Sequence, residues 1–293
     1  MPRLAFLGLG DIGTPMAARL ARTCELTVWN RTAAKAAAFS SQHGAICAPT
    51  VADAVRGAQV IATCLPTSPD VESLLDRAIP ALERGAVWVD FTSGDPAGSR
   101  RIAARLSKEA GVDYLDAPVS GGVAGAEAGT LTIMVGGSEL ALERVRGALD
   151  AVGQKVILCG PIGSGDAVKA VNNALLAVHL WSAAEGLAAL KSAGVSPSVA
   201  LDVINASSGR SNASMNLIPQ RVVTRKFPRT FRLALLDKDV GIAAQVAREQ
   251  KTPSPVLQLT AELMRLSSQL LGPQADHSEM VKVVEQWSGQ EIA

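Results

Sequence analysis

A lysine and an asparagine stand four positions apart, at Lys169 and Asn173, in an otherwise apolar stretch where charged side chains are rare. Residues at this spacing share one face of a helix. A lysine there can exchange a proton with an alcohol oxygen, and an asparagine can orient that oxygen. A lysine in a helix is more often solvated or snorkelling. The position of Lys169 just after a glycine-rich junction favours the chemical interpretation instead.

A second pattern, G-x-G-x-x-G, directly follows the first apolar run of the chain and opens a helical pattern. Glycines at these positions allow a tight turn, close approach of the backbone to a pyrophosphate, and packing of helix on strand. The free N–H groups of the helix N-terminus add positive partial charge for phosphates. We therefore predict a dinucleotide-binding turn. Its residues are Gly8, Leu9, Gly10, Asp11, Ile12 and Gly13.

The end of the second apolar run distinguishes between two forms of the dinucleotide. NAD-binding domains place Asp or Glu there, about 20 residues after the glycine turn, to accept hydrogen bonds from the ribose 2′-hydroxyl. This chain has Asn30, Arg31 and Thr32 instead. The planar guanidinium of Arg31 can pair with a 2′-phosphate, and its neighbours can add neutral hydrogen bonds. The sequence predicts NADP as cofactor, with NAD as the second option.

A glycine-rich loop, Ser120-Gly121-Gly122, follows a further apolar run. Ligands of open α/β sheets bind beyond the carboxyl ends of the strands, where such loops lie. Successive N–H groups and the Ser120 hydroxyl could bind a small anion such as a carboxylate. A glycine-rich loop is equally often only a tight turn, and the residues alone leave both interpretations open.

The elements that must position these residues alternate in the first half of the chain. Short apolar runs alternate with helical patterns, which indicates a mainly parallel sheet covered on both faces, a doubly wound α/β Rossmann-type domain. The predicted strands are Leu4–Leu7, Leu26–Trp29, Ala45–Ala48, Val60–Cys64, Val87–Asp90, Tyr114–Ala117, Leu131–Val135 and Lys155–Leu158, and the predicted helices include Thr14–Arg22, Ala33–Ser41 and Pro96–Glu109.

The strand pattern stops after Leu158, and nearly everything beyond is helical in pattern. We predict two domains, residues 1–161 and 162–293, the second all-α, joined by a long interdomain helix over Asp166–Ala193. That helix is apolar on almost every side, so it must be buried all round. One domain interface cannot easily cover it, which predicts a homodimer or homotetramer with contacts between the helical domains.

Composition narrows the class of protein. The 28 basic and 27 acidic residues leave a formal charge of +1, and aromatics make up 3%, which disfavours nucleic-acid binding. The four cysteines form no C-x-x-C pair and the three histidines are scattered, so no metal site is expected.

The apolar stretch Ala174–Leu190 contains His179 and Glu185, which favours a buried helix over a membrane span. With too short an apolar run after Met-Pro-Arg for a signal peptide, a cytoplasmic protein is expected.

The chain resembles the β-hydroxyacid dehydrogenase family, and within it the 3-hydroxyisobutyrate dehydrogenases, over nearly its whole length. The resemblance rests on four segments in family order: the turn Gly8–Ala17, the loop Asp116–Gly122, the block Gly163–Asn173 and the later Leu236–Asp239. Asn205–Ser211 carries the likeness to the 3-hydroxyisobutyrate dehydrogenases. Members that use NAD carry Asp after the second strand, whereas Asn30-Arg31-Thr32 resembles the NADP-using glyoxylate and semialdehyde reductases.

The resemblance implies a reversible hydride transfer between a nicotinamide and a short 3-hydroxy acid. The favoured reaction is the oxidation of 3-hydroxyisobutyrate to methylmalonate semialdehyde. It implies Lys169 as the general acid and base, with Asn173 as its catalytic partner. It also implies roles for residues around the substrate and the nicotinamide. These are Ser120, Gly121, Gly122, Asn172 and Lys238 for the substrate, and Leu65, Pro66, Ser93 and again Lys238 for the cofactor.

Three alternatives stay open. A reductase of tartronate semialdehyde, glyoxylate or succinic semialdehyde would use the same residues. Imine reductases resemble the family overall but typically lack the lysine found at position 169. A non-catalytic NADP-binding module would need neither the Lys169–Asn173 pair nor the carboxylate-binding loop.

Overall fold

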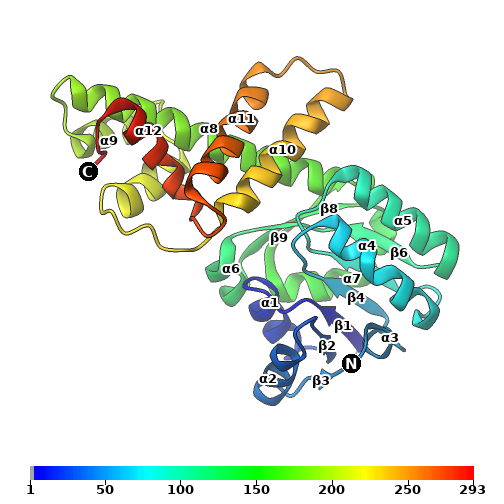
Figure 1. The fold of residues 1–293 in the computed structure, drawn as a ribbon. Helices are drawn as coiled ribbons and strands as arrows, with labels where there is room; N and C mark the ends of the chain where they lie inside the picture. The colour runs from blue at the N-terminus through cyan, green and yellow to red at the C-terminus, as the bar shows by residue number, and fades with distance from the viewer. Residues whose placement is uncertain (1–2) are drawn as a thin grey trace. The chain divides into compact units, whose positions relative to one another are not determined.

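The computed structural model describes residues 3–293 and divides the chain into two compact units, which meet in sequence between Lys169 and Ala170 (Figure 1). The first unit holds every strand of the sheet and the second is helical. The predicted fold class, an α/β domain followed by an all-α domain, is confirmed. The predicted boundary at 161/162 stays a proposal; residues 1 and 2, where the first predicted domain begins, lie outside the described residues.

The sheet of the first unit has nine strands within the described chain, in the order β3-β2-β1-β4-β5-β6-β8-β7, with β9 beside β8. From β3 to β6 all neighbours are parallel, which is the Rossmann order with its crevice beyond the carboxyl ends of β1 and β4. The strands are β1 Arg3–Leu7, β2 Glu25–Trp29, β3 Ile46–Cys47, β4 Val60–Thr63, β5 Val87–Asp90, β6 Asp113–Asp116, β7 Val119–Ser120, β8 Leu131–Gly136 and β9 Gly153–Gly160.

The eight predicted strands are all present, and each end lies within two residues of the predicted one. Strand β7 was not predicted, because two residues beside Pro118 give no apolar run. It pairs antiparallel with β8, as β6 does, so the sheet turns antiparallel at this edge. The carboxyl end of β7 is Ser120, so this short strand places the glycine-rich loop.

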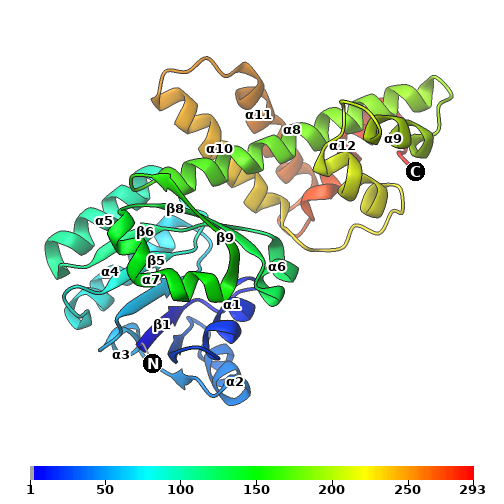
Figure 2. The same ribbon diagram turned by 180° about the vertical axis from the view of Figure 1, so that it is seen from behind.

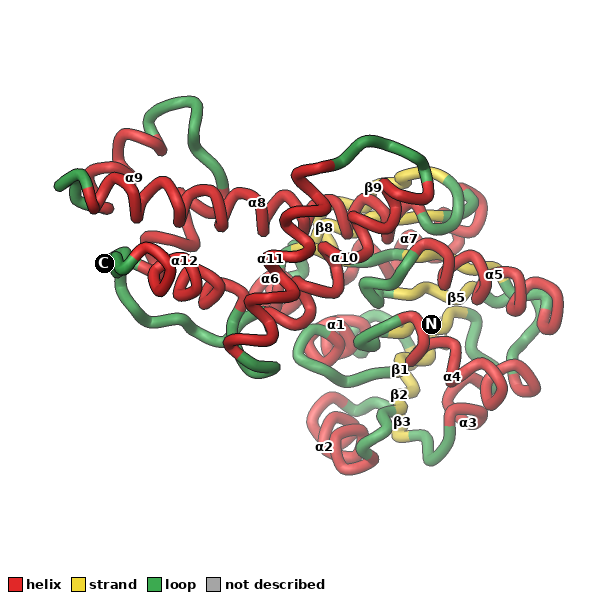
Figure 3. Tube along the Cα trace, turned by 45° about the horizontal axis from the view of Figure 1, so that its top comes forward, coloured by secondary structure: helices red, strands yellow, loops and turns green. Residues whose placement is uncertain are grey.

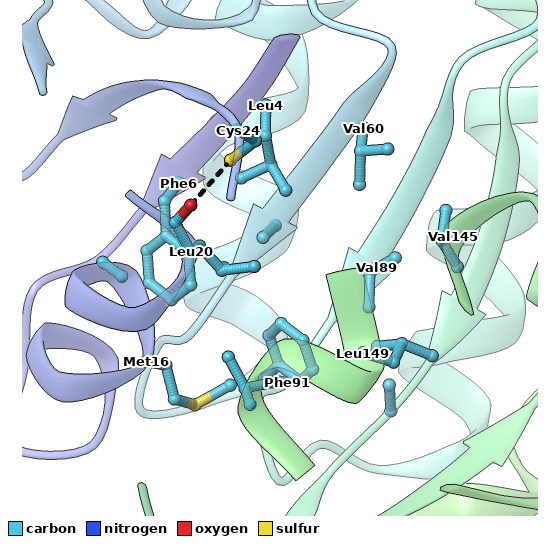
Figure 4. Packing of buried hydrophobic residues seen from close by; sticks show 14 of the residues in the cluster. Leu4, Phe6, Met16, Leu20, Cys24, Val60, Val89, Phe91, Val145 and Leu149 are labelled. Carbon is cyan, nitrogen blue, oxygen red and sulfur yellow. Dashed lines mark hydrogen bonds between the residues drawn. The ribbon is translucent and has the colours of Figure 1, made fainter. Parts of the chain in front are cut away.

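Helices cover both faces of the sheet, which explains why its strands are apolar throughout. On β1, Leu4 and Phe6 pack in one core cluster and Ala5 and Leu7 in another. The first cluster, part of which is drawn in Figure 4, includes residues of helices α1 Gly13–Leu20, α2 Ala33–His43, α6 Gly122–Ala128 and α7 Glu139–Val152. The second includes residues of α3 Val51–Val55, α4 Ser68–Ala78 and α5 Pro96–Ala110, and the short helix η1, Ile79–Ala81, follows α4.

Helix α8, Ser164–Ser192, is the predicted long helix, and it continues from the first unit into the second (Figure 2). It alone among the described helices is long and apolar enough to cross a membrane by length and composition. Its Ala174, Ala177, Leu180 and Trp181 lie in the core of the helical unit, as in the core helix of a soluble protein. In the single chain α8 is not buried all round, since Val168, Val171 and Leu175 are exposed. The subunit contact that would cover them stays a prediction.

The helical unit surrounds the second part of α8 with shorter helices (Figure 3). One of them, η2, is π-helical and contains Pro219, which lacks the N–H that a regular helix needs. Asp276 forms a capping box with Glu279 at the start of η3 and also accepts hydrogen bonds from Thr230 and Phe231. The elements are α9 Pro197–Asn205, η2 Ala213–Val222, α10 Leu233–Glu249, α11 Pro255–Leu271, η3 His277–Met280 and α12 Val281–Ser288.

Candidate active site

The glycine turn connects β1 to α1 as the sequence predicts. Gly8 has φ +111°, and a Cβ there would collide with the carbonyl oxygen of Cys64; a Cβ on Gly13 would collide with that of Gly8. These two glycines are required for packing of the turn itself. A Cβ on Gly10 would meet nothing within 4 Å, so this backbone can be approached by a ligand.

Helix α1 begins without a side-chain cap and without an acidic residue in its first turn. In this turn the Thr14 N–H donates to the Gly10 carbonyl at 3.0 Å and Pro15 carries no N–H, so the helix end acts on an incoming anion chiefly through its positive partial charge. Together with the exposed backbone at Gly10, this arrangement fits the pyrophosphate of a dinucleotide. The residues present thus fit NADP or NAD at this turn.

Asn30 lies at the end of β2 and is tied to the glycine turn. Its Oδ1 accepts a hydrogen bond from the N–H of Leu9 at 3.0 Å, and its Nδ2 donates to the carbonyl of Thr32 at 3.1 Å. Asn30 therefore fixes the turn relative to β2, beyond the ligand contact expected from the sequence. Arg31 and Thr32 are exposed beside it. A guanidinium in this position favours a ligand that carries a further phosphate.

The segments after β4 and β5 lie side by side at the same edge of the sheet. The Thr92 hydroxyl accepts a hydrogen bond from the N–H of Leu65 at 3.0 Å, which connects the Leu65-Pro66 segment with the Thr92-Ser93 segment. Buried Asp90, at the end of β5, accepts hydrogen bonds from the Thr63 hydroxyl and the Thr92 N–H. The two segments expected to contact the nicotinamide are thus held together by hydrogen bonds at the ends of β4 and β5.

The loop after β7 presents its glycines to solvent. Ser120 is half-buried, while Gly121 and Gly122 are exposed with φ of +136° and +64°. A side chain at either glycine would be strained. Helix α6 begins here without a side-chain cap or an acidic first turn. The N–H groups at this point can therefore serve a small anion, as the sequence suggested.

Two buried aspartates anchor the start of α8, which carries Lys169. Asp116 at the end of β6 accepts hydrogen bonds from the N–H groups of Gly163 and Asp166, at 2.7 and 3.0 Å. Asp166 accepts from the Gly94 N–H at 3.0 Å and from the Ser99 hydroxyl at 2.5 Å. Burial raises the pKa of both carboxyls, although these hydrogen bonds oppose the shift. Lys169 itself is half-buried, one turn after Asp166.

In the helical unit, buried Asn173 is bound to an acidic residue of α10. Its Nδ2 donates to Asp239 Oδ2 at 2.6 Å, and its Oδ1 accepts from the Nδ2 of Asn172 at 3.2 Å. Lys238 Nζ lies 3.2 Å from Asp239 Oδ1. Asn173 and Lys238 thus both contact the buried carboxylate of Asp239, and exposed Asn172 is connected to it only through the Asn173 amide.

From the sequence alone, no role is predicted for Asp116, Asp166 or Asp239. Each lies inside a segment that carried the family resemblance, yet the groups that donate hydrogen bonds to these carboxylates lie 47 to 72 residues away along the chain. Burial of an acidic residue in an apolar segment was the available signal, because such a group needs partners. Within residues 3–293, no three His, Cys, Asp or Glu side chains are grouped as a metal site.

Two family models match the chain. The one described as the NAD binding domain of 6-phosphogluconate dehydrogenase matches residues 3–160, and the one described as NAD-binding of NADP-dependent 3-hydroxyisobutyrate dehydrogenase matches residues 163–284. The chain is 34% identical over 295 residues to the 2-(hydroxymethyl)glutarate dehydrogenase of Eubacterium barkeri. This match covers 99% of this chain and 97% of that protein. It is 33% identical over 297 residues to the 2-hydroxy-3-oxopropionate reductase of Escherichia coli, covering 99% and 100%.

A solved structure resembles the whole chain. The 3-hydroxyisobutyrate dehydrogenase of Mycobacterium tuberculosis, in a structure with L-serine, has a TM-score of 0.90 and 30% identity, and the match covers 97% of this chain and 99% of that one. The chain belongs to the β-hydroxyacid dehydrogenases, NAD(P)-dependent oxidoreductases of small hydroxy acids. The family resemblance and the enzyme class expected from the sequence are confirmed.

Proposed function

We propose that this enzyme interconverts a short 3-hydroxy acid and its semialdehyde, with NADP as the preferred cofactor and 3-hydroxyisobutyrate as the favoured substrate. The observation that carries the proposal is the pair on α8: Lys169 and Asn173 stand one helical turn apart, and a buried carboxylate holds the Asn173 amide. A module that only binds the dinucleotide has no need for a lysine and an oriented amide.

Lys169 is the proton-transfer residue in this proposal. In oxidation its Nζ accepts the proton of the substrate hydroxyl, directly or through water, and in reduction its ammonium donates that proton. Asn173 orients the reacting oxygen with the Nδ2 hydrogen that Asp239 does not use. When bound, the nicotinamide supplies or accepts the hydride. Lys238, held beside Asp239, contributes a second positive charge toward substrate and cofactor.

The substrate carboxylate would bind at the loop after β7. Ser120, Gly121 and Gly122 offer a hydroxyl and successive N–H groups at the carboxyl edge of the sheet. A fixed anion site sets how far the reacting carbon lies from the carboxylate, which selects for acids of one short length. Asn172 adds a polar group beside Asn173.

Arg31 supports the preference for NADP. Its guanidinium is exposed beside the glycine turn, and no acid stands at the end of β2 to accept from a ribose 2′-hydroxyl. Leu65, Pro66 and Ser93 would line the nicotinamide, since their two segments lie side by side beyond β4 and β5, joined by the hydrogen bond from the Leu65 N–H to Thr92.

The second candidate is a reductase of tartronate semialdehyde, glyoxylate or succinic semialdehyde. The Escherichia coli relative, a 2-hydroxy-3-oxopropionate reductase, favours it, and the same side chains would serve. Imine reduction is less well supported, because it gives no role to Lys169. We propose a cytoplasmic homodimer or homotetramer.

An activity screen tests the proposal. Purified enzyme is assayed for oxidation of 3-hydroxyisobutyrate, L-serine and glycerate, and for reduction of the matching semialdehydes, of glyoxylate and of succinic semialdehyde, each with both forms of the cofactor, NADP(H) and NAD(H). We expect the highest kcat/KM with NADP and 3-hydroxyisobutyrate. A higher kcat/KM for tartronate semialdehyde would establish the second candidate, and no turnover of any of these compounds would refute both.

A further inference from the structure

Asp166 joins two parts of the first unit that the proposed reaction uses. It belongs to the first turn of α8, three residues before Lys169, which places the lysine about 4.5 Å further along the helix axis. The Asp166 side chain accepts a hydrogen bond from a residue outside the helix, the N–H of Gly94, at 3.0 Å. Gly94 directly follows Ser93, in the segment proposed to line the nicotinamide.

The second oxygen of Asp166 accepts from the hydroxyl of Ser99 at 2.5 Å. Ser99 lies in the first turn of α5, and its Oγ is 3.3 Å from the hydroxyl of Tyr114 on β6. The Tyr114 hydroxyl also donates to Asp90 at 2.9 Å. Asp166 and Asp90 therefore each accept from one of two neighbouring buried hydroxyls, Ser99 and Tyr114, so that Asp166 is packed against the carboxyl end of β5 through this pair.

Close packing fixes the position of this carboxylate. A Cβ on Gly94 would lie 2.5 Å from the Ser68 hydroxyl oxygen and 3.2 Å from Asp166 Oδ2. A Cβ on Gly165 would collide with the carbonyl oxygen of Met134 and lie 2.9 Å from an oxygen of Asp116. The first turn of α8 can therefore neither slide nor rotate without breaking these contacts.

A buried carboxylate is a costly way to hold a helix, since apolar residues of similar volume often hold one at least as well. Asp166 is 1% exposed, and both of its oxygens are used in directed bonds. Directed bonds fix geometry in a way that apolar packing does not. This distinction points to a role in the geometry of the site.

We propose that Asp166 is a positioning residue for hydride transfer, which keeps the Ser93-Gly94 segment and the first turn of α8 in one register. The inference rests on the proposed role of Lys169. Asp166 touches neither substrate nor cofactor in this account. It sets where Lys169 stands relative to the segment that lines the nicotinamide, and a misplacement of about 1 Å can cost on the order of 10²-fold in rate.

The test compares Asp166→Asn and Ser99→Ala with wild type at 25 °C. Each is assayed for kcat in semialdehyde reduction, for the isotope effect with NADPH deuterated at the transferred hydrogen, for the NADPH dissociation constant by fluorescence, and for Tm. We expect kcat to fall by about 10-fold or more. The isotope effect should rise because hydride transfer becomes more strongly rate-limiting, and NADPH affinity should stay within about threefold, since the glycine turn is unchanged.

Asp276→Asn is the matched control. Asp276 is also a buried, fully hydrogen-bonded carboxylate, but it caps η3 in the helical unit. Its variant should lower Tm and leave the kcat and isotope effect of the folded enzyme unchanged. A purely structural role for Asp166 would give the same pattern.

The inference is overturned if Asp166→Asn keeps wild-type kcat and isotope effect, whatever its Tm. If that variant does not fold, Ser99→Ala decides by the same criteria, because it removes one bond without a change of charge. Lys169→Ala in the same assay separates the two proposals. A fully active Lys169→Ala enzyme refutes the proposed function, and with it the role of Asp166. An inactive Lys169→Ala beside fully active Asp166→Asn and Ser99→Ala refutes only the positioning role.

Discussion

The Nδ2 of Asn173 on α8 donates a hydrogen bond to Asp239 Oδ2 on α10 over 2.6 Å, and both side chains are buried. Because Asp239 as a carboxylate can only accept, the bond fixes which end of the Asn173 amide is nitrogen. The Oδ1 of Asn173 accepts from Asn172. The orientation of the amide in the proposed mechanism therefore depends on a residue 66 positions away in sequence.

Asp239→Asn tests this dependence. An amide at position 239 can donate as well as accept. The Asn173 amide can then rotate by 180°, which exchanges its oxygen and nitrogen, so that its N–H no longer points at the substrate oxygen. We expect kcat to fall by about 10-fold or more, in line with the loss of other residues that orient reacting groups, with unchanged NADPH affinity. Steady-state kinetics and fluorescence titration measure the two effects.

Asp237→Asn is the control for this change, since Asp237 lies two residues earlier in α10 and its carboxyl interacts with Ser268 and Arg265. Its kcat should stay within about twofold of wild type, as is usual for changes outside the reacting groups. Equal losses in both variants would show that general damage to α10 explains the effect.

Cofactor preference should depend on Arg31 and Asn30. Arg31→Ala removes a charge-assisted contact worth about 1.5–3 kcal/mol, so kcat/KM with NADP should fall roughly 10- to 100-fold while that with NAD changes little. Asn30→Asp keeps an oxygen for the Leu9 N–H and adds a charge that repels a 2′-phosphate. It should move the preference toward NAD. A wild-type enzyme that clearly prefers NAD in kcat/KM would show that Arg31 has no such role.

The exposed apolar side chains on α8 predict an oligomer. Light scattering at micromolar concentration should give the mass of a dimer or tetramer, and Leu175→Glu, at a side chain 47% exposed in the single chain, should reduce it. Leu140→Glu is the control, because Leu140 is 81% exposed on α7 in the other unit. A monomeric wild type would contradict the prediction.

Two cysteines, Cys24 and Cys47, should differ in their reactivity toward iodoacetamide at pH 8. Burial raises the pKa of Cys24 to about 11, and its thiol donates to the Leu20 carbonyl at 3.1 Å (Figure 4). At pH 8 only about 10⁻³ of this thiol is ionised, so it should stay unmodified in the native enzyme, while exposed Cys47 reacts. Mass spectrometry of the alkylated protein gives the answer; labelling of Cys24 as fast as Cys47 would contradict it.

The same shift has a consequence for stability. In the unfolded chain the Cys24 thiol has its ordinary pKa of 9.0, whereas in the folded chain its pKa is about 11, so it stays protonated to higher pH. Its contribution to the free energy of unfolding is therefore complete below pH 9 and declines as the pH rises from 9 to 11. Cys24→Ala should flatten the fall of Tm over this interval. An identical Tm profile in both proteins would count against the shift.

The first unit could be predicted from the sequence because its signals are local. Apolar runs such as Val60–Thr63 are strands buried on both faces, and the glycine turn has one main structural interpretation. The roles of Asp116, Asp166 and Asp239 could not be predicted, since they depend on which distant backbone or amide groups the fold brings to each carboxylate. Strand β7 could not be predicted because two residues are too few to show an alternation of apolar and polar side chains, yet this strand sets the position of Ser120.

The kcat of Lys169→Ala and Lys169→Arg, with NADPH affinity measured beside it, tests the central claim most directly. Arginine keeps the positive charge but cannot act as a base near neutral pH. If Lys169 transfers the proton, both variants should lose about 10²–10⁴-fold in kcat and bind NADPH as wild type does, because the glycine turn and Arg31 are unchanged. A Lys169→Ala enzyme with full activity and ordinary NADPH binding would contradict the account and leave Lys238 as the next residue to test.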